Sequence, residues 1–179
     1  LILRLGGEGI ELEYVDLGGG LGITYHQEEP PHPQEYARAI IAEGKTLPCT
    51  FIFEPGRVIV GNAGILVTQV LYTKEGDKNF VVVDAAMNDL VRPTLYGSYQ
   101  EIVSVKEKEG DEMVADMVGP ICESGDFLAR DRAMPRFEPG DLVAVMSAGA
   151  YGFVMSSNYN SRLRVAEVLV KDDAFHLIR

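Results

Sequence analysis

The hydrophobic pattern of this 179-residue chain changes period close to residue 61. Before that point, two short β-prone runs near residues 11–17 and 49–54 flank a predicted helix that begins at Pro33, since proline is favoured in the first helical turn. After it, apolar and β-branched residues alternate in short runs bounded by turn residues, which is typical of an antiparallel sheet. These runs lie at residues 65–72, 80–84, 113–118, 142–146 and 163–170. The sequence therefore predicts an α/β portion over 1–60, followed by a mostly antiparallel β-barrel or sandwich over 61–179.

Both runs of the first portion end in loops with residues suited to binding an anion. Gly18, Gly19 and Gly20 follow the first run, and consecutive glycines can take positive φ and direct several backbone N–H groups at one phosphate. Glu-Pro-Gly-Arg, residues 54–57, follows the second run. Functional groups of parallel barrels gather at the C-terminal ends of the strands, so the two loops are expected to share one mouth. A simple tight turn at the glycines and a surface ion pair for Arg57 are the plain alternatives.

Two further segments carry chemically useful side chains. In residues 122–126, Cys-Glu-Ser-Gly-Asp, a thiol stands beside a carboxylate, which suggests a proton donor next to a cation binder. In residues 148–152, small residues surround Tyr151, so a bulky group could approach its hydroxyl. Taken singly, each segment has an ordinary structural explanation, because a cysteine is usually a small buried hydrophobe and a glutamate usually a solvated one.

Composition limits the class of protein. The formal net charge of −11 argues against nucleic acids and anionic membranes as partners, so an anionic ligand must be held by local donors. No apolar run is long enough to span a bilayer and no signal peptide is visible, which favours the cytoplasm. The two cysteines, Cys49 and Cys122, do not imply a disulfide framework.

Several other polar residues receive no functional role. No metal site is predicted, because the three histidines lack the spacing of metal ligands: His26, His32 and His176. Asp131 and Arg132 are expected to form a structural ion pair. The alternating charges of residues 106–112 are expected to form a solvated hairpin.

In this order along the chain, the motifs resemble those of the diaminopimelate decarboxylases, pyridoxal-phosphate enzymes of the fold-type III, alanine-racemase-like group. The glycine triplet and Glu-Pro-Gly-Arg are shared with ornithine and arginine decarboxylases. Arg-Pro-Thr-Leu-Tyr and Cys-Glu-Ser-Gly-Asp are what point to diaminopimelate. The resemblance covers essentially the whole chain and includes residues 16–22, 54–57, 84–87, 92–96, 119–126 and 148–160.

The resemblance implies an architecture and an assembly. Residues 1–60 would be the last part of a pyridoxal-phosphate-binding TIM (β/α)8 barrel, and 61–179 a C-terminal β domain with the catalytic Cys-Glu loop and a dimer interface. The family forms homodimers with shared active sites. Its lysine that forms a Schiff base with the cofactor lies on an early barrel strand that has no counterpart here. The chain is therefore expected to be the C-terminal portion of a longer enzyme, inactive alone.

The resemblance also implies residue roles. Cys122 would donate the proton that replaces carbon dioxide when meso-2,6-diaminopimelate becomes L-lysine, and Glu54 would pair with the pyridine nitrogen of the cofactor. The implied cofactor-binding residues are Gly18, Gly19, Gly20, Glu54, Pro55, Gly56, Arg57 and Tyr151. The implied substrate-binding residues are Arg57, Arg92, Tyr96, Glu123 and Tyr151. Alternatives are a related decarboxylase of ornithine, arginine or carboxynorspermidine, or a non-catalytic dimerisation fragment.

Overall fold

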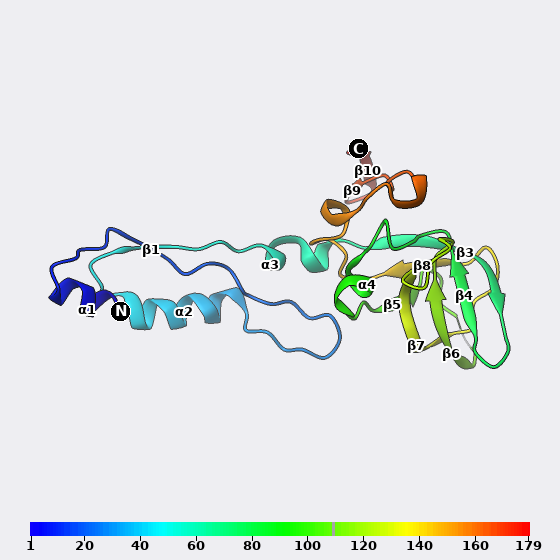
Figure 1. The fold of residues 1–179 in the computed structure, drawn as a ribbon, viewed down its shortest axis with the longest axis horizontal. Helices are drawn as coiled ribbons and strands as arrows, with labels where there is room; N and C mark the ends of the chain where they lie inside the picture. The colour runs from blue at the N-terminus through cyan, green and yellow to red at the C-terminus, as the bar shows by residue number, and fades with distance from the viewer. Residues whose placement is uncertain (109) are drawn as a thin grey trace. The chain divides into compact units, whose positions relative to one another are not determined.

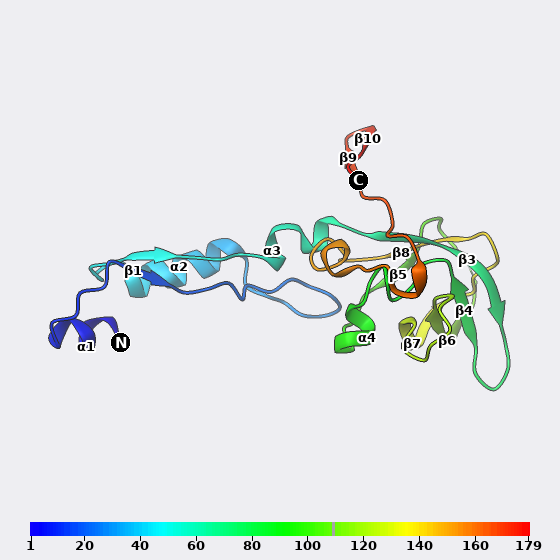
Figure 2. The same cartoon turned by 45° about the horizontal axis from the view of Figure 1, so that its top comes forward.

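The computed structural model describes residues 1–108 and 110–179. The chain divides into two compact units, Leu1–Val60 and Gly61–Arg179, and each is described by itself. Figure 1 labels the helices and strands of both units, and Figure 2 shows the same ribbon turned. None of the described helices is both long and apolar enough to cross a membrane.

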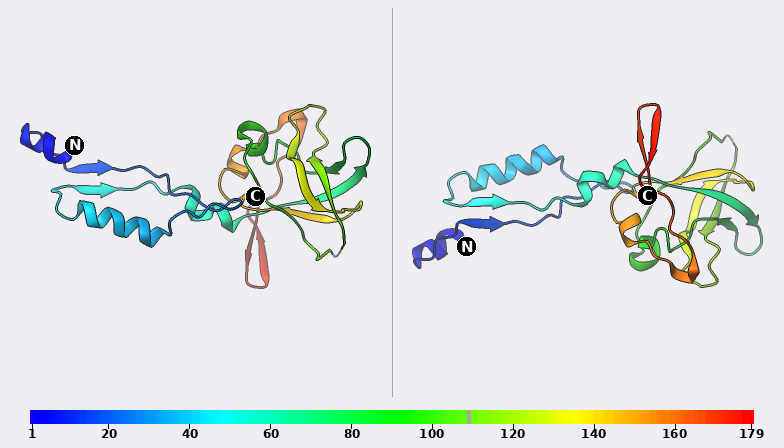
Figure 3. Two further views of the ribbon diagram at one scale, coloured as in Figure 1. Left: turned by 90° about the horizontal axis from the view of Figure 1, so that it is seen from below. Right: turned by 90° about the horizontal axis from the view of Figure 1, so that it is seen from above.

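The first unit is a strand–helix–strand arrangement. β1 (Tyr14–Asp16) pairs in parallel with β2 (Thr50–Ile52), and α2 (Pro33–Gly44) connects them and lies alongside the pair (Figure 3). Two short helices, α1 (Ile2–Gly7) and α3 (Arg57–Val60), stand at the ends of the unit. A parallel pair requires such a crossover, because a tight hairpin can join only antiparallel strands.

The start and the packing of α2 follow from its sequence. His32 caps the helix: its ring Nδ1 accepts a hydrogen bond from the Gln34 amide at 3.3 Å, and the Glu35 carboxylate accepts one from the His32 amide. Pro33 occupies the first turn, where a missing N–H costs nothing. At the other end, a Cβ on Gly44 would clash with the ring of Phe51, so glycine lets the helix approach β2. This reciprocal cap begins the helix where the sequence predicts it.

The second unit contains a six-stranded sheet in the order β5-β8-β3-β4-β6-β7. Neighbouring strands are antiparallel except β4 and β6, which run parallel. The bounds of the strands are β3 Leu66–Lys74, β4 Phe80–Val83, β5 Ile102–Ser104, β6 Glu112–Val118, β7 Phe127–Pro135 and β8 Leu142–Val145. The expectation of a mostly antiparallel β domain is confirmed.

The sheet curls so that it nearly closes into a barrel. The guanidinium of Arg132, on edge strand β7, donates a 2.9 Å hydrogen bond to the carbonyl of Gln100, just before edge strand β5. The same guanidinium lies 3.8 Å from the ring centroid of Tyr99. Apolar side chains fill the interior, among them the fully buried Val70, Val81, Val83, Met117, Leu128, Val143 and Val145.

Short elements complete the second unit. They are α4 (Arg92–Tyr96), the 3₁₀ turns η1 (Gly61–Ala63), η2 (Phe153–Met155) and η3 (Tyr159–Ser161), and a hairpin of β9 (Val168–Lys171) and β10 (Ala174–Leu177). Proline at the second position and Gly97 in the left-handed conformation at the end bound α4 within five residues.

Three local expectations need correction. The run predicted at 163–170 is a strand only from Val168, because the guanidinium of Arg164 holds the preceding segment against the carbonyls of Phe153 and Ser156. Strands β5 and β7 were not predicted, since three charged residues interrupt the pattern of β7. Asp131 pairs with Lys78 at 3.1 Å rather than with Arg132. The hairpin predicted at 106–112 includes Glu109, which lies outside the described residues.

Candidate functional site

The glycine loop and the Glu-Pro-Gly-Arg loop of the first unit lie against each other. The amide of Glu54 donates a 2.9 Å hydrogen bond to the carbonyl of Gly18, and a Cβ on Gly19 would clash with the carbonyl of Glu54. Asp16 fixes the entrance of the loop, because its carboxylate accepts a 2.7 Å hydrogen bond from the amide of Gly18. The adjacency of the two strand ends, expected from the sequence, is therefore present.

The geometry of the glycine loop fits an anionic group. Gly18 and Gly20 have φ of +70° and +92°, values that residues other than glycine rarely adopt. Nothing lies within 4 Å of the place where a Cβ would stand on either residue, so a phosphate could approach this backbone closely. Arg57 opens α3 in the same unit, and its guanidinium lies 5.6 Å from the ring centroid of Tyr25. The loop backbone at Gly18 and Gly20 is therefore suited to a phosphate group.

Arg92, Tyr96 and Tyr151 come together in the second unit. The guanidinium of Arg92 lies 5.5 Å from the ring centroid of Tyr96 and 5.6 Å from that of Tyr151. Arg92 is only 7% exposed, whereas the two tyrosines are partly open to solvent. Tyr151 holds a φ of +59°, and the chain turns so tightly here that a Cβ on Gly152 would clash with the carbonyl of Ala148. A guanidinium held between aromatic rings is suited to binding a carboxylate.

The Cys-Glu loop is anchored by the buried carboxylate of Asp126. One oxygen of Asp126 accepts a 2.7 Å hydrogen bond from the amide of Met87, and the other accepts a 2.6 Å bond from the amide of Ile121. Burial raises the pKa of Asp126, although both hydrogen bonds act to lower it. The loop also contacts α4, because the hydroxyl of Thr94 donates to the carbonyl of Gly125. The loop and the helix that carries Arg92 therefore form one connected structure.

Both oxygens of the exposed Glu123 carboxylate have hydrogen-bond donors. Oε1 accepts a 2.6 Å bond from the amide of Gly125, and Oε2 accepts a 3.1 Å bond from the hydroxyl of Tyr159. The preceding residue, Cys122, is a free and exposed thiol. A thiol and a carboxylate next to each other on one anchored loop are therefore open to a ligand.

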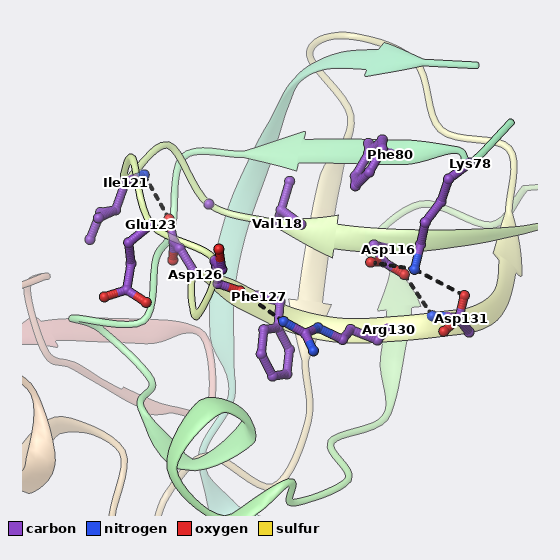
Figure 4. A pocket seen from close by; sticks show the side chains of 12 residues that line it. Lys78, Phe80, Asp116, Val118, Ile121, Glu123, Asp126, Phe127, Arg130 and Asp131 are labelled. Atoms are coloured by element: carbon purple, nitrogen blue, oxygen red, sulfur yellow. Dashed lines mark hydrogen bonds and ion pairs between the residues drawn. The ribbon is translucent and has the colours of Figure 1, made fainter. Parts of the chain in front are cut away.

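An open groove of about 520 Å³ runs beside this loop (Figure 4). Glu123 stands at one end, and an ion cluster stands at the other, where Lys78 contacts Asp116 at 2.9 Å. Between them the guanidinium of Arg130 lies 3.8 Å from the ring centroid of Phe127 and donates to the carbonyl of Ser124. The hydrogen bond that the Lys78 ammonium donates to Asp116 is the largest of the causes that raise the pKa of Lys78. The groove therefore carries charges of both signs.

Residues 84–89, which follow β4, support both the Cys-Glu loop and the C-terminal segment. Met87 contacts Asp126 as described, and Arg162 donates to the carbonyl of Asp84 at 2.5 Å and to the side chain of Asn88 at 2.9 Å. Burial raises the pKa of the neighbouring Asp89 carboxyl. Asp126, Asn88 and Arg162 received no role from the sequence. The motifs that contain these residues can be seen in the sequence, but only the fold shows that their side chains hold the Cys-Glu loop and the C-terminal segment.

The predicted site residues thus fall into two sets. One set lies in Leu1–Val60 and the other in Gly61–Arg179. The first contains Gly18, Gly19, Gly20, Glu54, Pro55, Gly56 and Arg57. The second contains Arg92, Tyr96, Cys122, Glu123 and Tyr151. Among residues 1–108 and 110–179, no three or more His, Cys, Asp or Glu side chains are grouped so that they could hold a metal ion.

Comparison with known proteins gives a consistent result. Residues 15–149 match the family model described as the C-terminal sheet domain of pyridoxal-dependent decarboxylases. The chain is 53% identical over 180 aligned residues to a diaminopimelate decarboxylase of Pseudomonas aeruginosa, an alignment that includes all of this chain and 43% of that protein.

Solved structures show the same relationship. A crystal structure of the protein AQ1208 from Aquifex aeolicus is 50% identical, with a TM-score of 0.94 over 99% of this chain and 44% of the other. Diaminopimelate decarboxylase from Helicobacter pylori, crystallised with L-lysine, is 43% identical, with a TM-score of 0.89 over 99% of this chain and 44% of the other. The chain spans less than half the length of these relatives. It belongs to the family of pyridoxal-dependent decarboxylases and contains residues of their C-terminal sheet domain.

Proposed function

We propose that the intact protein containing this chain is a diaminopimelate decarboxylase, which uses pyridoxal 5′-phosphate to convert meso-2,6-diaminopimelate into L-lysine and carbon dioxide. The observation that carries the proposal is the 53% identity to a diaminopimelate decarboxylase over the full length of this chain. The two sets of site residues support it, because each fits one part of the chemistry. The reaction would take place in the cytoplasm.

The first unit would supply part of the cofactor site, as the last strands of a TIM barrel. The backbone of Gly18, Gly19 and Gly20 would hold the phosphate, together with the backbone of residues 54–57. The carboxylate of Glu54 would face the ring nitrogen and keep it protonated. The cofactor, when bound, supplies an electron sink for the charge left by departing carbon dioxide. Tyr151 would contact the cofactor as well.

The second unit would select the substrate by its distal amino-acid end. That end carries a carboxylate and an ammonium group, so it needs a cation and an anion from the protein. Arg92, between Tyr96 and Tyr151, offers a guanidinium fork to the carboxylate, and Glu123 offers its carboxylate to the ammonium. Arg57 would bind substrate too. Simple diamine precursors such as ornithine lack the distal carboxylate, so they would leave Arg92 without its ligand.

Cys122 would act as the proton donor at the reacting carbon. It is exposed on an anchored loop beside Glu123, which would place the thiol next to the bound substrate. In the intact protein we expect a homodimer in which this loop completes the partner's site. Gly61–Arg179 would then contribute both the loop and the dimer interface.

Substrate profiling of the intact protein tests the proposed function. Carbon dioxide release is measured with meso-diaminopimelate, ornithine, arginine and carboxynorspermidine, each with pyridoxal phosphate present. We expect turnover of diaminopimelate and formation of L-lysine. Turnover of ornithine without turnover of diaminopimelate would refute the assignment.

A mixing experiment tests whether sites are shared between subunits. Gly19→Val should block the cofactor loop, because a Cβ there already clashes with Glu54, whereas Cys122→Ala should remove the proton donor. If each site combines a loop and a barrel from different subunits, mixing the two inactive variants should restore activity in the heterodimer. If each site lies within one subunit, the mixture should stay inactive.

A further inference from the structure

The position of the Glu123 carboxylate depends on a residue far away in the sequence. The hydrogen bond from the Gly125 amide to Oε1 is local and moves with the loop. The bond from the Tyr159 hydroxyl to Oε2 comes from η3, 36 residues later, and joins the loop to a separate segment. A carboxylate oxygen can accept two hydrogen bonds, so each oxygen of Glu123 retains capacity for a ligand.

The segment that carries Tyr159 is itself fixed. The amide of Ser157 donates a 2.9 Å hydrogen bond to the carbonyl of Asn88, and the Asn88 side chain donates to the Ser157 carbonyl at 3.3 Å. Asn160 and Ser161 then take φ of 58° and 59°, which turns the chain sharply after Tyr159. Asn88 is only 2% exposed, so this anchor lies in the interior of the unit. Tyr159 therefore projects from a tight turn fastened to the interior.

The two partners of the hydrogen bond rest on the same support. The Cys-Glu loop is attached to residues 84–89 through Met87 and Asp126, and the Tyr159 turn is attached there through Asn88. Arg162 adds a second attachment of the Tyr159 turn, because it donates to Asn88 and Asp84. The shared attachment to residues 84–89 thus sets the distance between Tyr159 and Glu123. Such a supporting contact holds a functional side chain in one productive geometry.

The chemistry of the pair fits a donor that is always protonated. The hydrogen bond to Glu123 and its negative charge raise the pKa of the Tyr159 hydroxyl above its ordinary value of 10.0. Tyr159 is 47% exposed, so the pair stands open to solvent rather than being closed off in the core. A ligand can therefore reach the carboxylate that Tyr159 holds.

We propose that Tyr159 is the positioning residue for Glu123: its hydroxyl orients the carboxylate that receives the distal ammonium group of the substrate. This inference rests on the proposed function, because it assigns Tyr159 a part in substrate recognition. Tyr159 acts on binding through Glu123 and takes no part in the proton transfer at the reacting carbon.

Tyr159→Phe in the intact protein tests the proposal, because it removes one hydroxyl and keeps the ring. We expect KM for meso-diaminopimelate to rise about tenfold, with kcat and the affinity for pyridoxal phosphate changed less than about twofold. The matched control is Tyr72→Phe, at an exposed tyrosine on β3, which should leave KM unchanged. An unchanged KM in Tyr159→Phe, or an equal loss of kcat and cofactor affinity, would overturn the proposal.

A double-mutant cycle separates positioning from an independent contact with substrate. If Tyr159 acts through Glu123, Tyr159→Phe should raise KM less than about twofold in a Glu123→Gln background. If the effects of the two substitutions on KM multiply independently, Tyr159 does not act through Glu123 and the proposal is wrong. Failure of the proposed function is distinguishable, since in that case the unmodified protein would not turn over diaminopimelate at all.

The contact can also be measured without any substrate. Tyrosine labelled with ¹³C at the ring Cζ reports its titration by NMR, with Tyr159→Phe identifying the signal. We expect Glu123→Gln to lower the pKa of Tyr159, because a neutral amide replaces the carboxylate whose hydrogen bond and negative charge raise it. An unchanged titration would contradict the proposal whatever the substrate of the enzyme.

Discussion

Gly119 lies directly against the buried carboxylate of Asp126. A Cβ on Gly119 would overlap with Oδ2 of Asp126 and would lie 2.7 Å from both Oδ1 and the carbonyl of Ala85. Neither neighbour can move easily. Two backbone amides hold the carboxylate of Asp126, and the carbonyl of Ala85 belongs to the backbone of a buried residue. Glycine is therefore required at position 119 because a side chain would not fit there. Its backbone conformation does not require glycine, since its φ is not in the left-handed region.

Gly119→Ala should destabilise the protein and displace the Cys-Glu loop. Overpacking of this kind costs about 1–3 kcal/mol of the free energy of unfolding. Denaturant unfolding of the intact protein measures the loss of stability, and a lower kcat would show that the Cys-Glu loop is displaced. The matched control is Gly76→Ala in the exposed β3–β4 turn, where the nearest atom would be 3.9 Å away and no loss is expected. Equal stability of the two variants would contradict the crowding at Gly119.

Cys122→Ala should lower turnover far more than cofactor binding, because a proton donor acts only after the cofactor is loaded. General acids contribute about 10²–10⁴-fold to rate, so kcat should fall within that range. The Kd of pyridoxal phosphate should change less than about twofold. Cys49→Ala, at the half-buried cysteine of the first unit, is the control and should retain normal kcat. A parallel loss of cofactor affinity in Cys122→Ala would assign the thiol to the cofactor site instead.

Arg92→Lys should weaken substrate binding although the charge is kept. A lysine offers a point charge and no planar fork, and it would not stack between Tyr96 and Tyr151 as the guanidinium does. We expect kcat/KM for diaminopimelate to fall about tenfold or more, on the order of 1.4 kcal/mol. Arg136→Lys, at an exposed arginine paired with Glu75, should be neutral. Normal kinetics of Arg92→Lys would remove Arg92 from the substrate site.

Asp141→Asn should lower stability at neutral pH and have little effect in acid. The hydrogen bond from Lys108 is the largest cause that lowers the pKa of Asp141 below its ordinary value of 3.8. A carboxyl with a lowered pKa adds stability that is present above pH 3.8 and is lost as the pH falls through the lowered value. The expected difference at pH 7 is about 0.5–1 kcal/mol, because the pair is partly exposed.

Unfolding curves at pH 7 and pH 3 check this dependence. Asn can still accept the bond from the amide of Glu138, so the substitution isolates the ion pair. Asp77→Asn, in the exposed β3–β4 turn, serves as the control. A difference between Asp141→Asn and the unmodified protein that stayed constant with pH would show that the ion pair is not its cause.

Several features of the fold could be predicted because they depend on neighbouring residues. Pro33 and the capping residues begin α2, and the alternation of residues 66–70 places Leu66, Thr68 and Val70 inside. The change of period near residue 61 lies where the two compact units adjoin in sequence. The motifs with glycine, cysteine, glutamate and arginine identified the decarboxylase family. Local backbone preference and side-chain periodicity are properties of a short segment, so they are visible without the fold.

The tertiary structure decided which segments meet. The parallel pairing of β4 with β6, the near closure through Arg132 and Gln100, and the anchoring of the Cys-Glu loop by Asp126 all join residues distant in sequence. The charged residues of β7 give no periodic signal, and β7 is a strand because it pairs along its length with β6, although the register shifts twice between Ala115 and Val118. The sequence by itself determined the family and the chemistry of single residues. Only the folded chain could set Tyr159 against Glu123, because such a contact depends on the packing of all the segments that hold both residues.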